Sequence, residues 1–492
     1  ETGKEGKGGM EEDMHNAPAD AALFAQWVQR VQYPADCVGA VGMYTEQEYF
    51  WGLGLGAQMV SLKFNFLHAL LAGSVYYFPT SHYVNPLRCQ SRSFDCYFER
   101  PTNCSREAHT RTRRDSIRWC GHMPTGELRA RAGLRDDHPV EWYHAQLSGF
   151  LFRPNAELRA YRELVRQGLE RSDPFSNASR AIAAEYASGS KKPTKKGGAG
   201  RRVGKGAGGT ARLRADAQHR AEAQGANAPR RRLAVVRAQS RRGVRRARRG
   251  ATPTLAELPP LPPAFNESRC LAVHMRRTDK FKTHRREDHL AAKGFVEYAQ
   301  LYKSWEYWRD TRGEGEPLPV VLLGSEDKQT FTHFPPLISP TASFWLPPSL
   351  FLMDMSKGKK FESINQGNAR LGQLYAAIEA RAKERQLGPP AAAAAAAAGD
   401  EEAMQMLKDE GGVLITQMML MSECVGFIGS YASNVAVLVH DLMASRGGPM
   451  IAMDVNGRVY CGCGASFCMT LERKVTRDPT KTLRGVIDTF KR

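Results

Sequence analysis

The feature that most constrains the fold is an alternation of short apolar runs with helical patterns between residues 270 and 445. The runs CLAVHM (270–275), VVLLG (320–324) and CVGFIG (424–429) are separated by longer segments with apolar residues at helical spacing. Strands that alternate with helices predict a parallel, doubly wound sheet of the α/β class. In such a sheet, ligands bind at the carboxyl ends of the strands.

A related pattern lies upstream. Residues 20–32 have helical spacing, residues 50–79 predict a glycine-rich loop followed by a helix and a strand, and residues 140–170 predict an amphipathic helical stretch interrupted at Pro154. Cysteine-rich loops are expected over residues 86–125. The other predictions are helices within 296–308, 368–386 and 411–423, a strand within 342–348, a helix within 435–445, and a linker at the polyalanine run 391–398.

The chain has 492 residues, which is enough for two or three domains. Composition and pattern together divide it into five parts. These are a disordered segment 1–20, a first α/β domain 21–173, a low-complexity basic insert 174–262, a second α/β domain 263–475 and a tail 476–492.

The basic charge is confined to the insert. Residues 189–250 hold 20 Lys and Arg against two acids, which is +18 of the net charge of +19. An RNA-binding tail is one interpretation, but the segment lacks the interleaved aromatic residues that stack on bases. We therefore expect a disordered insert in a nearly neutral folded protein, and no nucleic-acid partner.

The cysteines and glycosylation sequons favour the secretory pathway. Ten cysteines are clustered along the chain, and Asn-x-Ser sequons occur at Asn103, Asn177 and Asn266. No pair of CxxC motifs has zinc spacing, so no structural metal is expected. The alternative is a reduced cytosolic enzyme. No run of 18 apolar residues could span a membrane, and the ETGKEGKGG start leads us to expect a signal or anchor segment outside this sequence.

Two adjacent arginines follow the run at 270–275. Guanidinium groups fit phosphate oxygens, so Arg276 and Arg277 at a strand end predict an anion site. The turn GSYASN (429–434) precedes a helix whose first N–H groups also favour phosphate. Two anion-binding elements at one edge of the sheet suggest that the ligand is a diphosphate. The alternative is a surface ion-pair cluster with the nearby acids Asp279, Glu287 and Asp288.

Two further sequence features bear on how a sugar nucleotide would bind. No DxD motif occurs, so protein cations rather than a metal would neutralise a leaving diphosphate. The stretch GLGLGAQ (52–58) lacks the GxGxxG spacing. We interpret it as a tight loop in which the backbone approaches a ligand or a helix.

VHMRRTDK (273–280) resembles the signature of the α1,6-fucosyltransferases of glycosyltransferase family 23, which are related to bacterial chitooligosaccharide fucosyltransferases. Further stretches similar to that family occur in the same order. They are YPADC (33–37), GLGAQ (54–58), EWYHAQLSGFLFRPN (141–155), VEY (296–298), VVLLGSED (320–327) and FIGSYASNVAVLVHDLM (427–443). The resemblance covers roughly residues 25–175 and 268–445.

The resemblance implies a fold of two Rossmann-like domains facing a cleft, of the GT-B type. The first would lie on the acceptor side, and the second would bind GDP-fucose. It implies an inverting, metal-independent transfer of fucose without a cofactor to a GlcNAc-containing glycan, α1,6 on an N-glycan core. It also implies a glycoprotein of the Golgi lumen acting in protein glycosylation, with a glycan or glycoprotein acceptor; a homodimer is left open.

Carried onto this chain, the family's donor-binding pattern assigns five residues. His274 and Arg276 would hold the GDP moiety, and Ser433 with Asn434 would bind the diphosphate at the start of a helix. Asp327 lies where the family has an acid near the nucleotide. A buried core histidine and a helix cap are the alternatives for His274 and Ser433.

The catalytic assignments fall on the loop after residue 275. Arg277 would neutralise the β-phosphate as it leaves, Lys280 would support the loop, and Glu287 would be the general base. The family's glutamate position is His284 here, and the loop is about five residues longer, so the other candidates for the base are Asp288, His284 and His289.

Several functions stay open. An aspartate that binds the nucleotide in the family corresponds to Gln417, which permits a transferase of the same fold with another sugar nucleotide. A glycan-binding relative without catalysis is a second alternative, because the base has changed. A nucleic-acid binder acting through residues 189–250 is the third.

Overall fold

The computed structural model describes residues 12–45, 54–109, 111–115, 123–171, 270–276, 294–311, 320–325, 330–338, 342–345, 375–407, 409–447, 451–455, 460 and 462–463. Residues 1–189 and 261–492 form one compact unit. Residues 190–260, the core of the predicted basic insert, form the second and lie outside the described residues.

The second half of the chain forms a parallel sheet of five strands in the order β6-β5-β4-β7-β8. The strands are β4 (Cys270–Met275), β5 (Val320–Ser325), β6 (Ala342–Trp345), β7 (Gly426–Gly429) and β8 (Ile451–Asp454). The prediction of a parallel α/β sheet is therefore confirmed, and β8 is a strand that the sequence analysis did not predict.

Both faces of this sheet are buried, which explains why β4 and β5 are apolar throughout. Leu271, Val273 and Met275 belong to a cluster with Tyr298 of α9 (Phe295–Thr311). Ala272 lies on the other face, in a cluster with residues of α14 (Glu410–Glu423) and α15 (Asn434–Ser445). Successive side chains of a strand point to opposite faces.

The first half of the chain contributes a smaller parallel sheet, β2-β1-β3, and a layer of helices. The strands are β1 (Val41–Thr45), β2 (Val75–Tyr77) and β3 (Arg111–Asp115). The helices are α1 (Glu12–Gln32), α3 (Leu55–Leu71), α4 (Thr125–Ala132), α5 (Val140–Leu151) and α6 (Ala156–Arg171), and short 3₁₀ turns occupy Phe94–Cys96 and Arg106–Ala108. The predicted break at Pro154 falls between α5 and α6.

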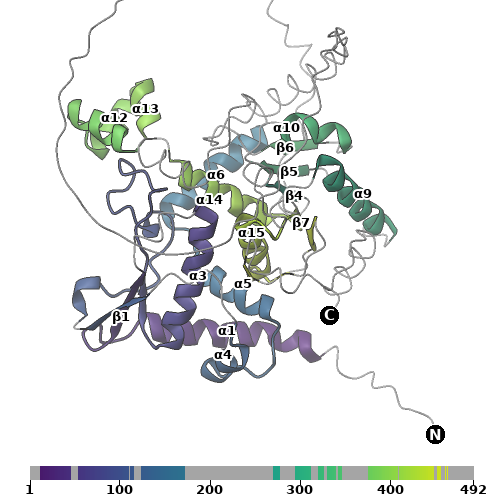
Figure 1. The fold of residues 1–492 in the computed structure, drawn as a ribbon, viewed down its shortest axis with the longest axis horizontal. Coiled ribbons are helices and arrows are strands. Elements are labelled where there is room, and N and C mark those ends of the chain that lie inside the picture. Colours follow the sequence, from purple (N-terminus) through teal and green to yellow (C-terminus); the bar gives the residue numbers. More distant parts are fainter. Residues whose placement is uncertain are drawn as a thin grey trace, which may run out of the picture. The chain divides into compact units, whose positions relative to one another are not determined.

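One hydrophobic core joins the two halves. Helix α15 follows β7 in the second half, yet it packs against α5 and α3 of the first half (Figure 1). Leu62 and Phe66 of α3, Leu147 of α5 and Leu438 of α15 belong to one buried cluster. The described residues of both halves are therefore built around shared apolar contacts. The finer prediction of two domains facing a cleft stays a prediction.

Two predictions about local structure are wrong. The polyalanine run is not a linker: it forms α12 (Pro389–Ala397), followed by α13 (Glu401–Met406). Alanine has the highest helix propensity, and proline at the first helical positions lacks only an N–H that would be unpaired anyway. The predicted disordered segment 1–20 is too long, because α1 begins at Glu12. The side chain of Asp20 anchors this helix by accepting hydrogen bonds from the backbone of Arg135 and Asp136.

The remaining described elements are α10 (Thr330–His333), a 3₁₀ turn at Pro335–Leu337 and a helical segment 375–384. None of the helices in the described part of the chain combines the length and the apolar character needed to cross a membrane.

Three disulfides between described residues confirm the prediction from the cysteine clusters. They join Cys37 to Cys104, Cys89 to Cys96, and Cys270 to Cys424. The last pair links the first residue of β4 to the residue after α14. Disulfides persist in oxidising compartments, so these bonds are consistent with a secretory or extracellular environment.

We predict unequal contributions of two disulfides to stability. The Cys270–Cys424 bond spans 154 residues and the Cys89–Cys96 bond spans seven. From chain entropy, replacing the first pair by alanine should lower the free energy of unfolding by about 5 kcal/mol, and replacing the second by about 2.5 kcal/mol. Denaturant titration of both double-alanine variants measures the difference; equal losses would contradict the prediction.

Candidate functional site

The order of the strands indicates where a ligand would bind. From β4 the chain adds β5 and β6 on one side, and then β7 and β8 on the other. The connections that leave the carboxyl ends of β4 and β7 therefore run in opposite directions. Ligands of parallel α/β sheets bind at such a switch point. The described residues closest to it are those that end β4 and those that follow β7.

At the end of β4 lie two predicted donor-binding residues. His274 is buried, with 5% of its surface exposed. By the alternation of the strand it lies on the same face as Ala272, which α14 and α15 cover. Arg276 is the first residue after β4 and is partly exposed. A cation therefore lies at the carboxyl edge next to the switch point.

After β7 the chain makes a tight turn into α15. The Ser433 N–H donates to the carbonyl of Ser430 at 2.8 Å, and the Tyr431 N–H donates to the Asp454 carboxylate at the end of β8. Ser433 is the N-cap of α15, but its side chain does not cap the helix. The N–H groups of a first turn, and the helix dipole, favour an anion. Asn434 begins the helix.

A second helix begins at the same place. Gly54 is the N-cap of α3 and has no side chain to cap it. A β-carbon on Gly56 would lie 3.2 Å from the Val435 nitrogen and 3.4 Å from the Asn434 β-carbon. The first turns of α3 and α15 are thus in direct contact. The prediction that the GLGLGAQ backbone approaches a helix is confirmed at Gly56, but the prediction of a loop is wrong for residues 55–58, which form the first turn of α3.

Tyr83 is a site residue that the sequence analysis missed. Burial raises the pKa of its phenol, while the guanidinium of Arg276 and a hydrogen bond with the Leu55 backbone act in the opposite direction. The phenol therefore lies close to both the end of β4 and the start of α3. It follows β2 in a turn, SHYVNP, that carries no recognisable motif.

The start of α14 adds negative charge to this region. Asp409 caps the helix by accepting the Gly412 N–H, and it also accepts the Tyr97 hydroxyl at 2.7 Å. Burial raises the pKa of the Asp409 carboxyl, although the bonds from Tyr97 and Gly412 and the charge of Arg88 oppose the rise. The next residue, Glu410, is close enough to raise the pKa of the Tyr83 phenol.

The structure brings four of the nine predicted site residues to the carboxyl edge: His274, Arg276, Ser433 and Asn434. Gln417 is buried in the middle of α14, with 3% of its surface exposed. The other four lie outside the described residues, and their assignments stay predictions; they are Arg277, Lys280, Glu287 and Asp327.

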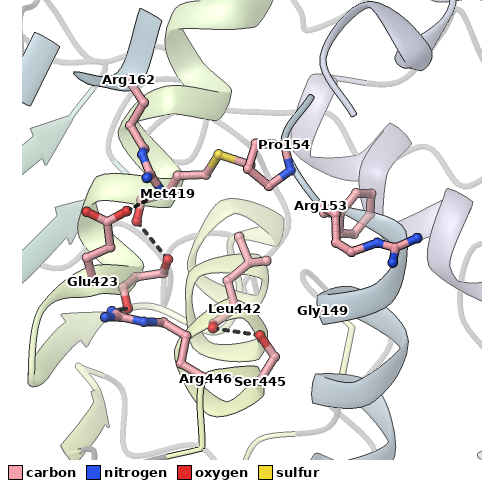
Figure 2. Close-up of a pocket in the computed structure, with 11 residues that line it drawn as sticks. Gly149, Arg153, Pro154, Arg162, Met419, Glu423, Leu442, Ser445 and Arg446 are labelled. Atoms are coloured by element: carbon pink, nitrogen blue, oxygen red, sulfur yellow. Dashed lines mark hydrogen bonds and ion pairs between the residues drawn. The ribbon is translucent and has the colours of Figure 1, made fainter. Parts of the chain in front are cut away.

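A pocket of about 370 Å³ lies at the carboxyl ends of α14 and α15, away from the helix starts described above (Figure 2). Arg162 donates to Glu423 at 2.7 Å, and Arg446 donates to the Ser422 carbonyl near the end of α14. These arginines are therefore engaged in an ion pair and a C-terminal cap. The pocket lies at the carboxyl end of α15, about 16 Å along the helix from Asn434, so it is distinct from the switch point.

Within the described ranges, no three His, Cys, Asp or Glu side chains gather as a metal site. A scan against models of known protein families finds no matching family, and a search of curated proteins finds no matching relative. The functional assignment therefore depends on the motifs and on the geometry of the carboxyl edge.

We predict that a side chain at Gly56 would destabilise the protein. Gly56 and Gly126 are each the second residue of a helix, but a β-carbon on Gly126 would meet nothing within 4 Å. Gly56→Ala should lower the free energy of unfolding by about 1–3 kcal/mol through overpacking. The matched control Gly126→Ala should raise it by about 0.5–1 kcal/mol. Denaturant titration compares them, and a stabilised Gly56→Ala variant would refute the close contact.

Proposed function

We propose that the protein is an inverting, metal-independent fucosyltransferase that moves fucose from GDP-fucose to a GlcNAc-containing glycan, α1,6 on an N-glycan core. The observation that carries the proposal is the position of Arg276 at the switch point, next to the start of α15. An arginine and a helix N-terminus at one edge suit a nucleoside diphosphate. The motif resemblance supplies the choice of GDP-fucose.

In this proposal the second half of the chain binds the donor. The motif resemblance assigns His274 and Gln417 to the nucleotide, and both are buried on the same side of the sheet. The first turn of α15 would bind the diphosphate, together with Arg276. The start of α3 and Tyr83 come from the first half, so the donor would contact both halves of the chain.

The chemistry requires one base and a neutralised leaving group. The acceptor hydroxyl oxygen attacks C1 of fucose from the face opposite the diphosphate, and a C–O bond forms with inversion. The bond between C1 and the β-phosphate oxygen breaks, and GDP leaves with its electron pair. Glu287 would take the hydroxyl proton, an effect of about 10²–10⁴ in rate. Arg276 and Arg277 would stabilise the negative charge that develops on GDP.

The proposal also includes the cellular setting. The three disulfides support a protein of the secretory pathway, and we propose the Golgi lumen, where glycans are modified. Asn103, the first of the three sequons, is exposed in a loop beside Cys104, a position accessible to glycosylation.

One buried residue favours a second candidate donor. Gln417 offers an amide where the family has an aspartate, and an amide both donates and accepts hydrogen bonds. The second candidate is therefore a transferase of the same fold that uses another sugar nucleotide. A donor screen with the same acceptors distinguishes the two.

We predict that the protein releases GDP from GDP-fucose in the presence of EDTA and an N-glycan acceptor. Arg276→Ala and Arg277→Ala should each lower kcat/KM by about 10² or more, because each removes a positive charge from the leaving diphosphate. Glu287→Gln should lower kcat and leave GDP binding intact. Arg131→Ala, in the exposed part of α4, is the control and should keep wild-type turnover.

The outcomes separate the alternatives. Turnover that survives in Glu287→Gln would move the base to another residue of the loop. If the protein binds GDP but releases none from GDP-fucose with any acceptor, it would be a non-catalytic glycan-binding protein. If nucleotide is released only from a different sugar nucleotide, that sugar nucleotide would replace GDP-fucose as the proposed donor.

A further inference from the structure

A charged pair lies in the middle of the shared hydrophobic core. The Lys63 ammonium of α3 donates to the Asp441 carboxylate of α15 at 2.6 Å, and both side chains are fully buried. The two residues are 378 positions apart in the chain. Lys63 lies outside the motifs that suggested the function, and Asp441 lies in the motif 427–443 without an assigned role.

The pair is completed by three further hydrogen bonds. Ser148 of α5 donates to the same carboxylate oxygen at 2.9 Å, and the Tyr460 hydroxyl donates to the other oxygen. The Lys63 ammonium also donates to the Gly462 carbonyl at 2.9 Å. The network thus joins α3, α5, α15 and the segment 460–463, which follows β8 in the chain.

Gly462 shows how closely this segment is held. Its φ of +73° lies in the left-handed region, and a β-carbon there would fall 1.9 Å from the His144 Nε2 atom. Only glycine fits this position. The carbonyl that accepts from Lys63 is therefore presented by backbone packed directly on α5.

Packing alone does not require a charged pair here. The neighbours Leu62 and Phe66 on α3 are fully buried apolar residues, and an apolar residue could fill the place of Lys63. Burying two charges costs more than burying apolar groups of similar volume, so such pairs add little net stability. Their best-attested role is to specify one register between packed elements.

The register of α3 against α15 is what this pair can specify. At the N-terminal ends Gly56 contacts Asn434 and Val435, and seven residues further along α3 Lys63 meets Asp441. The spacing on α15 is six to seven residues, so the helices run parallel. A slip of one helical turn, about 5.4 Å, would break the ion pair and separate the two N-termini.

Electrostatics agree with an ionised pair. Burial acts to raise the pKa of the Asp441 carboxyl, but the Lys63 charge and the neighbouring histidines override it and hold that pKa below its ordinary value. Burial lowers the pKa of the Lys63 ammonium, and the Asp441 charge opposes that shift.

We propose that Lys63 and Asp441 are positioning residues of the donor site, which hold the first turns of α3 and α15 level with each other. The inference rests on the proposed function, which assigns the first turn of α15 to the diphosphate and the start of α3 to the donor site. The pair would act on affinity for the diphosphate through the backbone of Gly56 and Asn434, without touching it. The ligand class is a nucleoside diphosphate, and the probe is GDP.

The test uses a variant that removes both charges together. Lys63→Met/Asp441→Asn leaves no unpaired buried charge. The Asn amide keeps one oxygen acceptor and offers an N–H, which the second of the two hydroxyls, Ser148 or Tyr460, can accept. Glu127→Gln/Arg131→Met neutralises an exposed ion pair on α4 and is the matched control. The measurements are thermal unfolding, GDP affinity by calorimetry, and hydrogen exchange of the segment 431–438, which includes the Val437 N–H bonded to Ser433.

The expected result is a folded double variant with cooperative unfolding, GDP affinity about tenfold weaker than wild type, and faster exchange across 431–438. The control should match wild type in all three measurements. GDP affinity and exchange equal to wild type in the folded double variant would overturn the inference, because the pair would then have a structural role only.

Two further outcomes keep the inference separate from the proposed function. If the wild-type protein binds no GDP, the proposed function fails, and hydrogen exchange alone decides whether the pair holds the first turn of α15. If the double variant does not fold, Asp441→Asn and Lys63→Met are measured singly; wild-type GDP affinity in whichever of these folds would overturn the inference.

Discussion

The rest of the structure depends on the packing of α15, because this helix belongs to two cores at once. It follows β7 and covers one face of the parallel sheet, and its opposite side packs against α3 and α5. Nine consecutive residues of the helix, 435–443, are buried as a result. A helix buried all round must be apolar on every side. His440 and Asp441 are the polar exceptions, and Asp441 is the residue that Lys63 neutralises.

This packing also explains how the proposed anion-binding edge would form without a phosphate-binding motif. In a parallel sheet the strands end where the following helices begin, so Arg276 after β4 and the first turn of α15 after β7 lie at one edge. The contact of Gly56 with Val435 brings the start of α3 to the same place. Positive charge from three segments therefore converges, although their motifs are separated by more than 150 residues in the chain.

Acidic residues also lie near this edge. Asp409 and Glu410 begin α14, which also starts at the carboxyl side of the sheet. The Asp409 carboxylate is satisfied by Tyr97 and by the helix it caps. Burial raises the pKa of the Asp409 carboxyl, and so acts against its charged form.

Much of the second half could be predicted because both faces of its sheet are buried. Strands covered on both sides are short continuous apolar runs, and β4, β5 and β7 have that form. The strand β3 has the sequence RTRRD, which has no apolar period, so only its pairing with β1 reveals it. The polyalanine helix was missed because a run without polar residues has no period to read.

The sequence by itself determined the α/β class of the sheet and the position of Arg276 and Arg277 after a strand, because these depend on local period and composition. It also determined the cysteine clusters, which close as disulfides. The tertiary structure alone decided that Lys63 pairs with Asp441, that Gly56 meets α15 and that Tyr83 neighbours Arg276. Those contacts join residues hundreds of positions apart, and packing, rather than any local preference, selects such partners.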